Sequence, residues 1–196
     1  MNEGINYLKE GDPKLPATNF DEVIKRDSLS WIAFYYRGIC KKNLVQFEDA
    51  RKDLLHAKRI NPKQAAVYVE LGELYHVQNI FNKATDEYEK AIELDPQMVQ
   101  AYYNLGSVAL TKGDLRKGLK YYQKCNEVNP KFPQALMMQG LVKFLARKKD
   151  TESIPFFDKA VSADSTYALT YLCRGLAYIT LEKPYGCLKN WNVLIR

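Results

Sequence analysis

The stretch that decides the fold is residues 65–98, which read AAVYVELGELYHVQNIFNKATDEYEKAIELDPQM. In its first half, Tyr68, Leu71, Gly72 and Tyr75 follow the i, i+3, i+4, i+7 spacing of one face of an α-helix. The spacing therefore predicts a helix whose apolar face is buried against a neighbour.

The second half of the stretch predicts another helix. Ala84, Tyr88 and Ala91 follow the i, i+4, i+7 spacing. The pair Asp95-Pro96 ends this helix, because proline cannot continue a helix and disfavours helical geometry in the residue before it. The whole stretch is therefore predicted to be a helix hairpin.

The same pattern recurs along the chain with a period of 34 or 35 residues. One column of the repeat is glycine and holds Gly4, Gly38, Gly72, Gly106, Gly140 and Gly175. A second column is large and mostly aromatic and holds Phe20, Leu54, Tyr88, Tyr122, Phe157 and Trp191. Because glycine has no Cβ atom, the two helices of a hairpin can approach closely there, and we interpret both columns as packing rather than chemistry.

The period, the glycine, the small and aromatic positions and the closing proline resemble the tetratricopeptide repeat (TPR) family. The resemblance implies an all-α fold, a right-handed superhelical solenoid of antiparallel helix hairpins with about five to six repeats. It covers 1–196 as a single array, with a partial unit at 1–30, units at 31–64, 65–98, 99–132 and 133–167, and a shortened unit at 168–196. The departures from the family pattern are Arg37, Gln139 and Arg174 in place of leucine, Lys41 and Lys143 in place of an aromatic residue, and Ser165 in place of proline.

Composition excludes several classes of protein. The chain has 196 residues, 46% of them hydrophobic and 27% charged, so it is neither a fibre nor a disordered tail. It contains no apolar run near the ~20 residues of a membrane-spanning helix and does not begin like a signal peptide. The four cysteines form no CxxC pair, and although a Cys173–Cys187 disulfide is an alternative, we expect a reduced, cytoplasmic protein.

The sequence carries no motif for catalysis, metal or cofactor. Its two histidines, His56 and His76, fall in different units, and no cluster of Cys and His has metal-ligand spacing. Glu73 and His76 share a helix face and could act as an acid–base pair, but a solvated polar pair is the simpler interpretation. We therefore predict that the chain is not an enzyme and binds no cofactor.

The net charge of +6 raises nucleic acid as a partner. Residues 65–98, however, carry two lysines against seven acids, which would interrupt a basic track for a phosphate backbone. We do not expect nucleic-acid binding.

What the resemblance implies about function is a scaffold that binds a partner protein or peptide in a concave groove lined by the first helix of each unit. Two alternatives remain open: a structural module that self-associates through its C-terminal end, and a regulatory segment of a larger protein. The expected groove residues are Ile5, Tyr35, Ile39, Lys42, Val69, Glu70, Glu73, His76, Tyr103, Ser107, Leu110, Met137, Leu141, Phe144, Leu172, Leu176 and Ile179.

Overall fold

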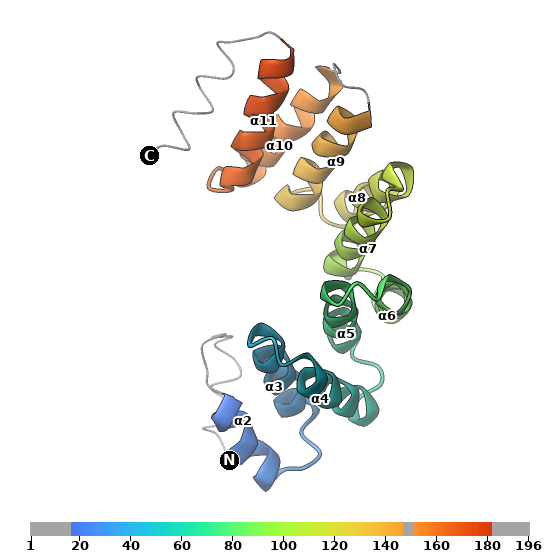
Figure 1. The fold of residues 1–196 in the computed structure, drawn as a ribbon, viewed down its shortest axis with the longest axis vertical. Helices are drawn as coiled ribbons and strands as arrows, with labels where there is room; N and C mark the ends of the chain where they lie inside the picture. Colours follow the sequence, from blue (N-terminus) through green and yellow to red (C-terminus); the bar gives the residue numbers. More distant parts are fainter. Residues whose placement is uncertain (1–16, 147–150, 182–196) are drawn as a thin grey trace. The chain divides into compact units, whose positions relative to one another are not determined.

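The computed structural model describes residues 17–146 and 151–181 (Figure 1). These residues form ten α-helices and one short 3₁₀ helix and contain no β-strand, which confirms the expected all-α class. The helices are α2 (Ala17–Arg26), α3 (Trp31–Asn43), α4 (Phe47–Ile60), α5 (Ala65–Val77), α6 (Phe81–Leu94), α7 (Val99–Thr111), α8 (Leu115–Val128), α9 (Pro133–Ala146), η1 (Thr151–Ser153), α10 (Ile154–Ala163) and α11 (Ala168–Thr180).

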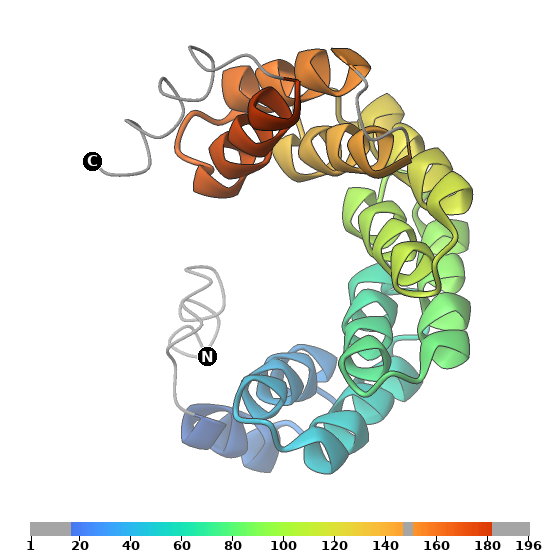
Figure 2. The ribbon, with the colours of Figure 1, turned by 45° about the horizontal axis from the view of Figure 1, so that its top comes forward.

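The chain divides into two compact units, an N-terminal unit up to Met98 and a C-terminal unit from Val99. Within the N-terminal unit α3 pairs with α4 and α5 with α6; within the C-terminal unit α7 pairs with α8 and α9 with α10 (Figures 1 and 2). The helices α3, α5, α7, α9 and α11 begin at residues 31, 65, 99, 133 and 168, the first residues of the predicted repeats. We call these five the first helices and their partners the second helices.

The glycine column is where the two helices of a hairpin touch. A Cβ atom on Gly72 would lie 2.5 Å from Cε1 of Tyr88, and one on Gly106 would lie 2.6 Å from Cε1 of Tyr122. Both tyrosines are fully buried. The aromatic ring of the second helix thus lies directly on the glycine of the first, and any side chain at the glycine would displace the ring.

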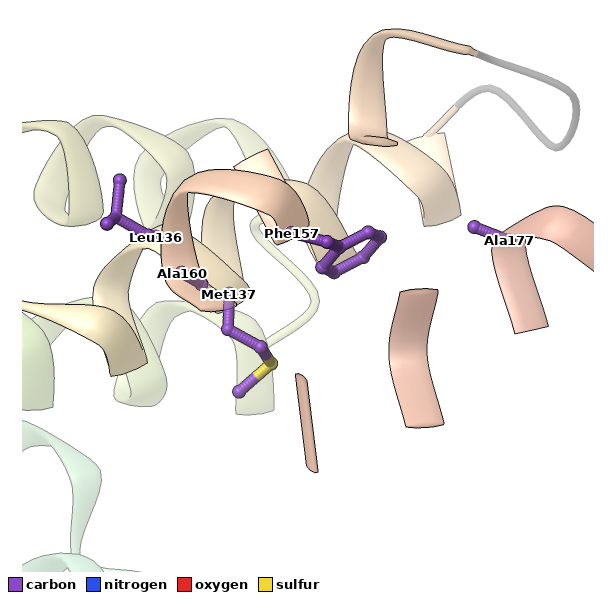
Figure 3. Packing of buried hydrophobic residues seen from close by; sticks show 5 residues of the cluster. All are labelled: Leu136, Met137, Phe157, Ala160 and Ala177. Carbon is purple, nitrogen blue, oxygen red and sulfur yellow. The ribbon is translucent and has the colours of Figure 1, made fainter. Parts of the chain in front are cut away.

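The core of the C-terminal unit continues this packing across three helices. Phe157 on α10 occupies the ring position over Gly140, where a Cβ would be 2.8 Å from its Cε1. It belongs to a cluster with Leu136, Met137, Ala160 and Ala177, and Figure 3 shows the Phe157 ring extending toward Ala177 of α11. A single ring therefore joins α9 and α10 to the next first helix.

The breaks between hairpins are fixed by a side chain as well as by proline. Oδ1 of Asp95 accepts a hydrogen bond from the Gln97 amide at 2.9 Å. Oδ1 of Asn129 accepts one from the Lys131 amide at 3.1 Å, and Asp27 and Asp164 make the same contact two residues ahead. These turns satisfy backbone donors that the helix end leaves open, so the acidic or amide residue at these four breaks has its own structural purpose, whether proline or serine follows it.

The turns inside three hairpins share one backbone conformation, a residue with positive φ. Val45, Asn79 and Gly113 stand 34 residues apart and all have positive φ, at 63°, 60° and 80°. The next amide in each turn donates back to the preceding helix, as Asp114 does to the Ala109 carbonyl at 2.9 Å. This is a left-handed helix stop, which glycine adopts freely, asparagine tolerates and a β-branched residue resists. Asp114 then caps α8 by accepting a hydrogen bond from the Lys117 amide.

The strain at Val45 predicts opposite effects of two substitutions. Val45 is 69% exposed, so Val45→Gly loses little packing, relieves the backbone and raises the free energy of unfolding by about 1 kcal/mol. Gly113→Val introduces the same strain at a position where a Cβ meets no atom within 4 Å. It should lower the free energy of unfolding by about 1–2 kcal/mol. Urea denaturation of both variants checks the pair, and equal effects of the same sign would contradict the strain argument.

Candidate functional site

The expected groove residues that contact one another across two first helices lie in the N-terminal unit, where α3 contacts α5. Lys42, one turn beyond Ile39 and two turns beyond Tyr35 on α3, reaches across to Glu70 and Glu73 on α5. All five residues are partly exposed and all five belong to the expected groove. We call these five residues the α3–α5 face.

Lys42 is the centre of this face. Its Nζ lies 2.6 Å from Oε2 of Glu70 and 2.7 Å from Oε2 of Glu73. Burial by itself lowers the pKa of Lys42, but the charges of Glu70 and Glu73 outweigh it and the pKa is raised. Burial raises the pKa of Glu70, against the opposing charge of Lys42. The three groups therefore form a partly desolvated cluster with two carboxylates for one ammonium, and Glu73, whose side chain is 31% exposed, is its most accessible member.

Aromatic rings lie beside the charged cluster. The Tyr35 ring packs against Trp31 at a centroid distance of 6.2 Å and against Tyr36 at 5.1 Å. Burial, together with the nearby charge of Glu70, raises the pKa of the Tyr35 hydroxyl well above its ordinary value. Tyr35 is thus a neutral hydrogen-bonding ring next to a charged cluster, a combination that suits contact with a mixed apolar and cationic side chain.

His76 lies one turn beyond Glu73 on α5, and its ring packs against an aromatic side chain. Its ring meets Phe81 edge-on at a centroid distance of 5.9 Å. Burial lowers the pKa of His76, and the charge of Glu73 opposes this only in part. The imidazole is therefore neutral near pH 7, and its electrostatic link to Glu73 is the one feature retained from the acid–base pair considered above.

An ion network around the buried Asp53 holds α3 from its other side. Arg37 donates to both carboxylate oxygens of Asp53, at 2.8 and 2.6 Å, and to Asp21 at 2.6 Å. Lys41 adds a contact to Asp53 at 2.8 Å, and the Asp53 side chain is only 6% exposed. Arg37 and Lys41 are two of the departures from the family pattern, so the residues that break the leucine and aromatic columns replace apolar packing by ion pairing.

Two of the other departures also make polar contacts. Gln139 on α9 donates to the Tyr122 carbonyl on α8 at 2.9 Å, and Arg174 on α11 donates to Asp158 on α10 at 2.6 Å. Each of these residues, like Arg37 with Asp21, reaches the second helix of the preceding hairpin. The sequence held a signal for this, since an acid stands 16 residues before both arginines, but the partner could be recognised only once the packing of successive hairpins was known.

Several expected groove residues of the C-terminal unit are packed inside it. The Tyr103 ring lies 5.6 Å from both Tyr122 and Phe132. Ser107 shares a 3.2 Å contact with the Tyr122 hydroxyl. Leu110 lies against Gly118, where a Cβ would be 2.8 Å from its Cδ2. These side chains support the hairpin and offer only part of their surface to a partner.

Two expected groove residues are core residues, which corrects the sequence interpretation. Val69 is 5% exposed and Met137 only 1%. Met137 is covered because α11 packs on α9, with Cys173 Sγ 3.9 Å from Met137 Sδ. The contact between α9 and α11 therefore buries this position of the repeat at Met137, whereas Tyr35 and Tyr103 at the same position stay partly exposed.

The remaining expected residues separate by exposure. Leu141 and Phe144 are half-buried, and Phe144 packs against the cluster of Figure 3. Leu172, Leu176 and Ile179 on α11 are 41%, 48% and 49% exposed. Ile5, Cys187 and the C-terminal end from Trp191 lie outside the described residues. Within the described ranges, no three His, Cys, Asp or Glu side chains group as metal ligands, and no helix there has the length and hydropathy needed to cross a bilayer.

Comparison with known proteins bears on the repeats directly. Residues 76–113 match a family model described as TPR repeat, and residues 99–132 match one described as tetratricopeptide repeat. Stress-induced-phosphoprotein 1 of Caenorhabditis elegans is 28% identical over 93 residues, which are 47% of this chain and 29% of that protein. The chain thus spans under a third of the length of this relative.

Two solved structures show the likeness of fold. The structure of Pseudomonas aeruginosa PilF has a TM-score of 0.80 and 16% identity, covering 95% of this chain and 85% of PilF. YrrB, described as a TPR protein with an unusual peptide-binding site, has a TM-score of 0.65 and 21% identity, covering 92% of each chain. At these identities the likeness concerns the fold alone.

The ion network around Asp53 predicts an asymmetric response to mutation. Asp53→Ala removes the carboxylate shared by Arg37 and Lys41 and should lower the free energy of unfolding by about 3 kcal/mol. Arg37→Leu places a leucine at the repeat position that Leu71 and Leu105 occupy, and Asp53 keeps its ion pair with Lys41. This variant should therefore lower the free energy of unfolding by less than Asp53→Ala does. Denaturant titration compares the two, and a larger loss for Arg37→Leu would overturn the assignment of Asp53 as the centre of the network.

The lowered pKa of His76 predicts a pH dependence with a definite sign. The unfolded chain, with an ordinary histidine pKa of about 6.5, binds more protons below that pH than the folded chain does. Wild type should therefore lose stability as the pH falls below about 6.5, and His76→Gln should lose less over the same range. Urea denaturation above and below this pH measures the difference, and parallel curves for the two proteins would show that His76 does not contribute.

Proposed function

Because this chain carries tetratricopeptide repeats, a fold of protein-interaction scaffolds, we propose that it is a non-catalytic scaffold that binds a segment of a partner protein on the α3–α5 face. The observation that carries the proposal is the cluster of Lys42, Glu70 and Glu73, which joins two first helices beside the ring of Tyr35.

The cluster is ordered before any partner arrives. Lys42 and Glu70 have side chains only 13% and 17% exposed, so folding has already removed most of their water. A partner that contacts them displaces little further water and orders no flexible side chain. The α3–α5 face can therefore orient a bound segment at a low cost in free energy.

The charges of the face favour a particular partner chemistry. Two carboxylates lie against one ammonium, and Glu73 is the more exposed of the two carboxylates. Tyr35 and Ile39 provide apolar surface on the adjoining turns of α3. We propose that the bound segment carries a lysine or arginine next to an apolar side chain, with the apolar contact supplying affinity and the charge supplying orientation.

Two further features support this proposal. The acids of residues 65–98 disfavour a phosphate backbone as the ligand, and YrrB shows that one protein with a similar fold has a peptide-binding site. The cysteine spacing, without a paired motif, supports a reduced compartment such as the cytoplasm as part of the proposal.

A library of random linear peptides displayed on phage, panned against the immobilised full chain, tests the proposal. We expect the selected peptides to share a basic residue beside an apolar one. A synthetic peptide of the selected sequence should bind at least ~10-fold more weakly to a Tyr35→Ala, Glu73→Gln double variant than to wild type. These positions suit the test better than Tyr103 and Phe144, which are packed in the C-terminal unit.

The matched control is Leu55→Ala with Glu89→Gln, which removes one exposed apolar side chain and one exposed carboxylate from second helices. The control should bind like wild type, and the binding should weaken as salt is added. Selected peptides without a basic residue, or equal binding by the Tyr35→Ala, Glu73→Gln variant, would contradict the proposal.

A further inference from the structure

The last described first helix, α11, has a row of exposed side chains that are all aliphatic. Leu169, Leu172, Leu176 and Ile179 are 45%, 41%, 48% and 49% exposed. We call these four residues the α11 stripe. The only charged residue of α11, Arg174, lies outside the stripe and is bonded to Asp158. Contiguous exposed aliphatic surface on a helix indicates contact with another molecule or segment.

The same positions of the repeat are polar or mixed in the other described first helices. The four positions hold Ala66, Val69, Glu73 and His76 in α5, and Gln100, Tyr103, Ser107 and Leu110 in α7. Among the first helices that the structure describes, α11 alone has a large aliphatic residue at all four. The chemistry of the stripe is therefore distinct from that of the α3–α5 face.

The preceding first helix shows how this surface is used within the chain. The matching positions of α9 are Gln134, Met137, Leu141 and Phe144, and α11 packs beside them. Met137 is 1% exposed there, whereas its counterpart Leu172 is 41% exposed. The α11 stripe thus continues an established helix–helix interface, and the occupant it fits is a further apolar helix.

The spacing of the residues in the α11 stripe indicates which helix could pack against it. The steps from Leu169 to Leu172, to Leu176 and to Ile179 are 3, 4 and 3 residues, which is the seam of a coiled coil. The pattern 3-4-3 reads the same in both directions. Two α11 helices related by a two-fold axis and running antiparallel would therefore place Leu172 opposite Leu176 of the second copy and Leu169 opposite Ile179 of the second copy. No charge in the stripe opposes this pairing.

We infer that the α11 stripe is a self-association surface, through which two copies of this chain form an antiparallel α11–α11 pair. The inference goes beyond the proposed function, because it concerns a different helix and a different partner chemistry. Self-association through the C-terminal end of the chain was one of the alternatives that the sequence left open; the inference concerns the described helix α11 instead.

Sedimentation velocity of the full chain over a wide range of protein concentration tests the inference. Wild type should form a dimer whose fraction rises with concentration. Leu172→Glu with Leu176→Glu places like charges against each other and should weaken the dimer at least ~10-fold. Leu55→Glu with Leu145→Glu changes two other exposed leucines, 42% and 52% exposed, and should leave the dimer unchanged.

A charge swap tests the geometry. In Leu172→Lys with Leu176→Glu, the antiparallel arrangement sets each lysine opposite the glutamate of the second copy, so the dimer should recover at low salt relative to the double-glutamate variant. A parallel pair would set lysine opposite lysine and should not recover. Circular dichroism of each variant establishes that the helices are intact.

The outcomes separate the inference from its competitors. A wild-type chain that is monomeric at all concentrations overturns it. If the glutamate variants then unfold more easily, another segment of this chain covers the stripe; if their stability is unchanged, the stripe serves a partner of different sequence. Because the peptide test uses the α3–α5 face, a wild-type chain that stays monomeric but still binds the selected peptide identifies failure of the inference alone.

Discussion

The structure depends on one contact, the ring of a second helix placed on the glycine of its first helix. A Cβ atom would come within 2.5–2.8 Å of the ring or leucine side chain at Gly38, Gly72, Gly106 and Gly140, so glycine is required for the hairpin to close. Closure buries the ring completely and sets the distance between the two helices. The exposed residues of α3 and α5, including the α3–α5 face, are positioned by this contact.

Where the apolar pattern is interrupted, ionic or hydrogen-bonded links take over. Arg37, Gln139 and Arg174 occupy one position of the repeat, and each bonds to the second helix of the preceding hairpin. An apolar residue at that position would pack equally well against any neighbour, whereas a charged or amide side chain needs its own partner. The departures from the family pattern therefore distinguish one hairpin junction from another, which is a form of specificity that hydrophobic packing alone does not provide.

The sequence was sufficient for the helices, their hairpins and the packing columns, because these follow from a periodic pattern within single hairpins. It was also sufficient to bring Tyr35, Lys42, Glu70 and Glu73 to one face. It failed at Val69 and Met137, which are both buried. Met137 is covered by α11, and no pattern within one repeat determines how another first helix packs. It also missed the strained turn at Val45, where a valine takes the conformation that glycine takes at Gly113, and the hydrogen bonds of Asp27, Asp95, Asn129 and Asp164.

The change in chemistry along the first helices has a physical consequence. A charged, partly desolvated cluster discriminates between ligands by charge and orientation, and its attraction weakens with salt. A seam of leucine and isoleucine discriminates by shape and spacing, and its strength follows the apolar area that it buries. The α3–α5 face and the α11 stripe lie in different compact units and use these two different forces. A scaffold built in this way can pair with itself through one surface while the other remains selective for a charged segment, and neither contact competes with the other for the same residues.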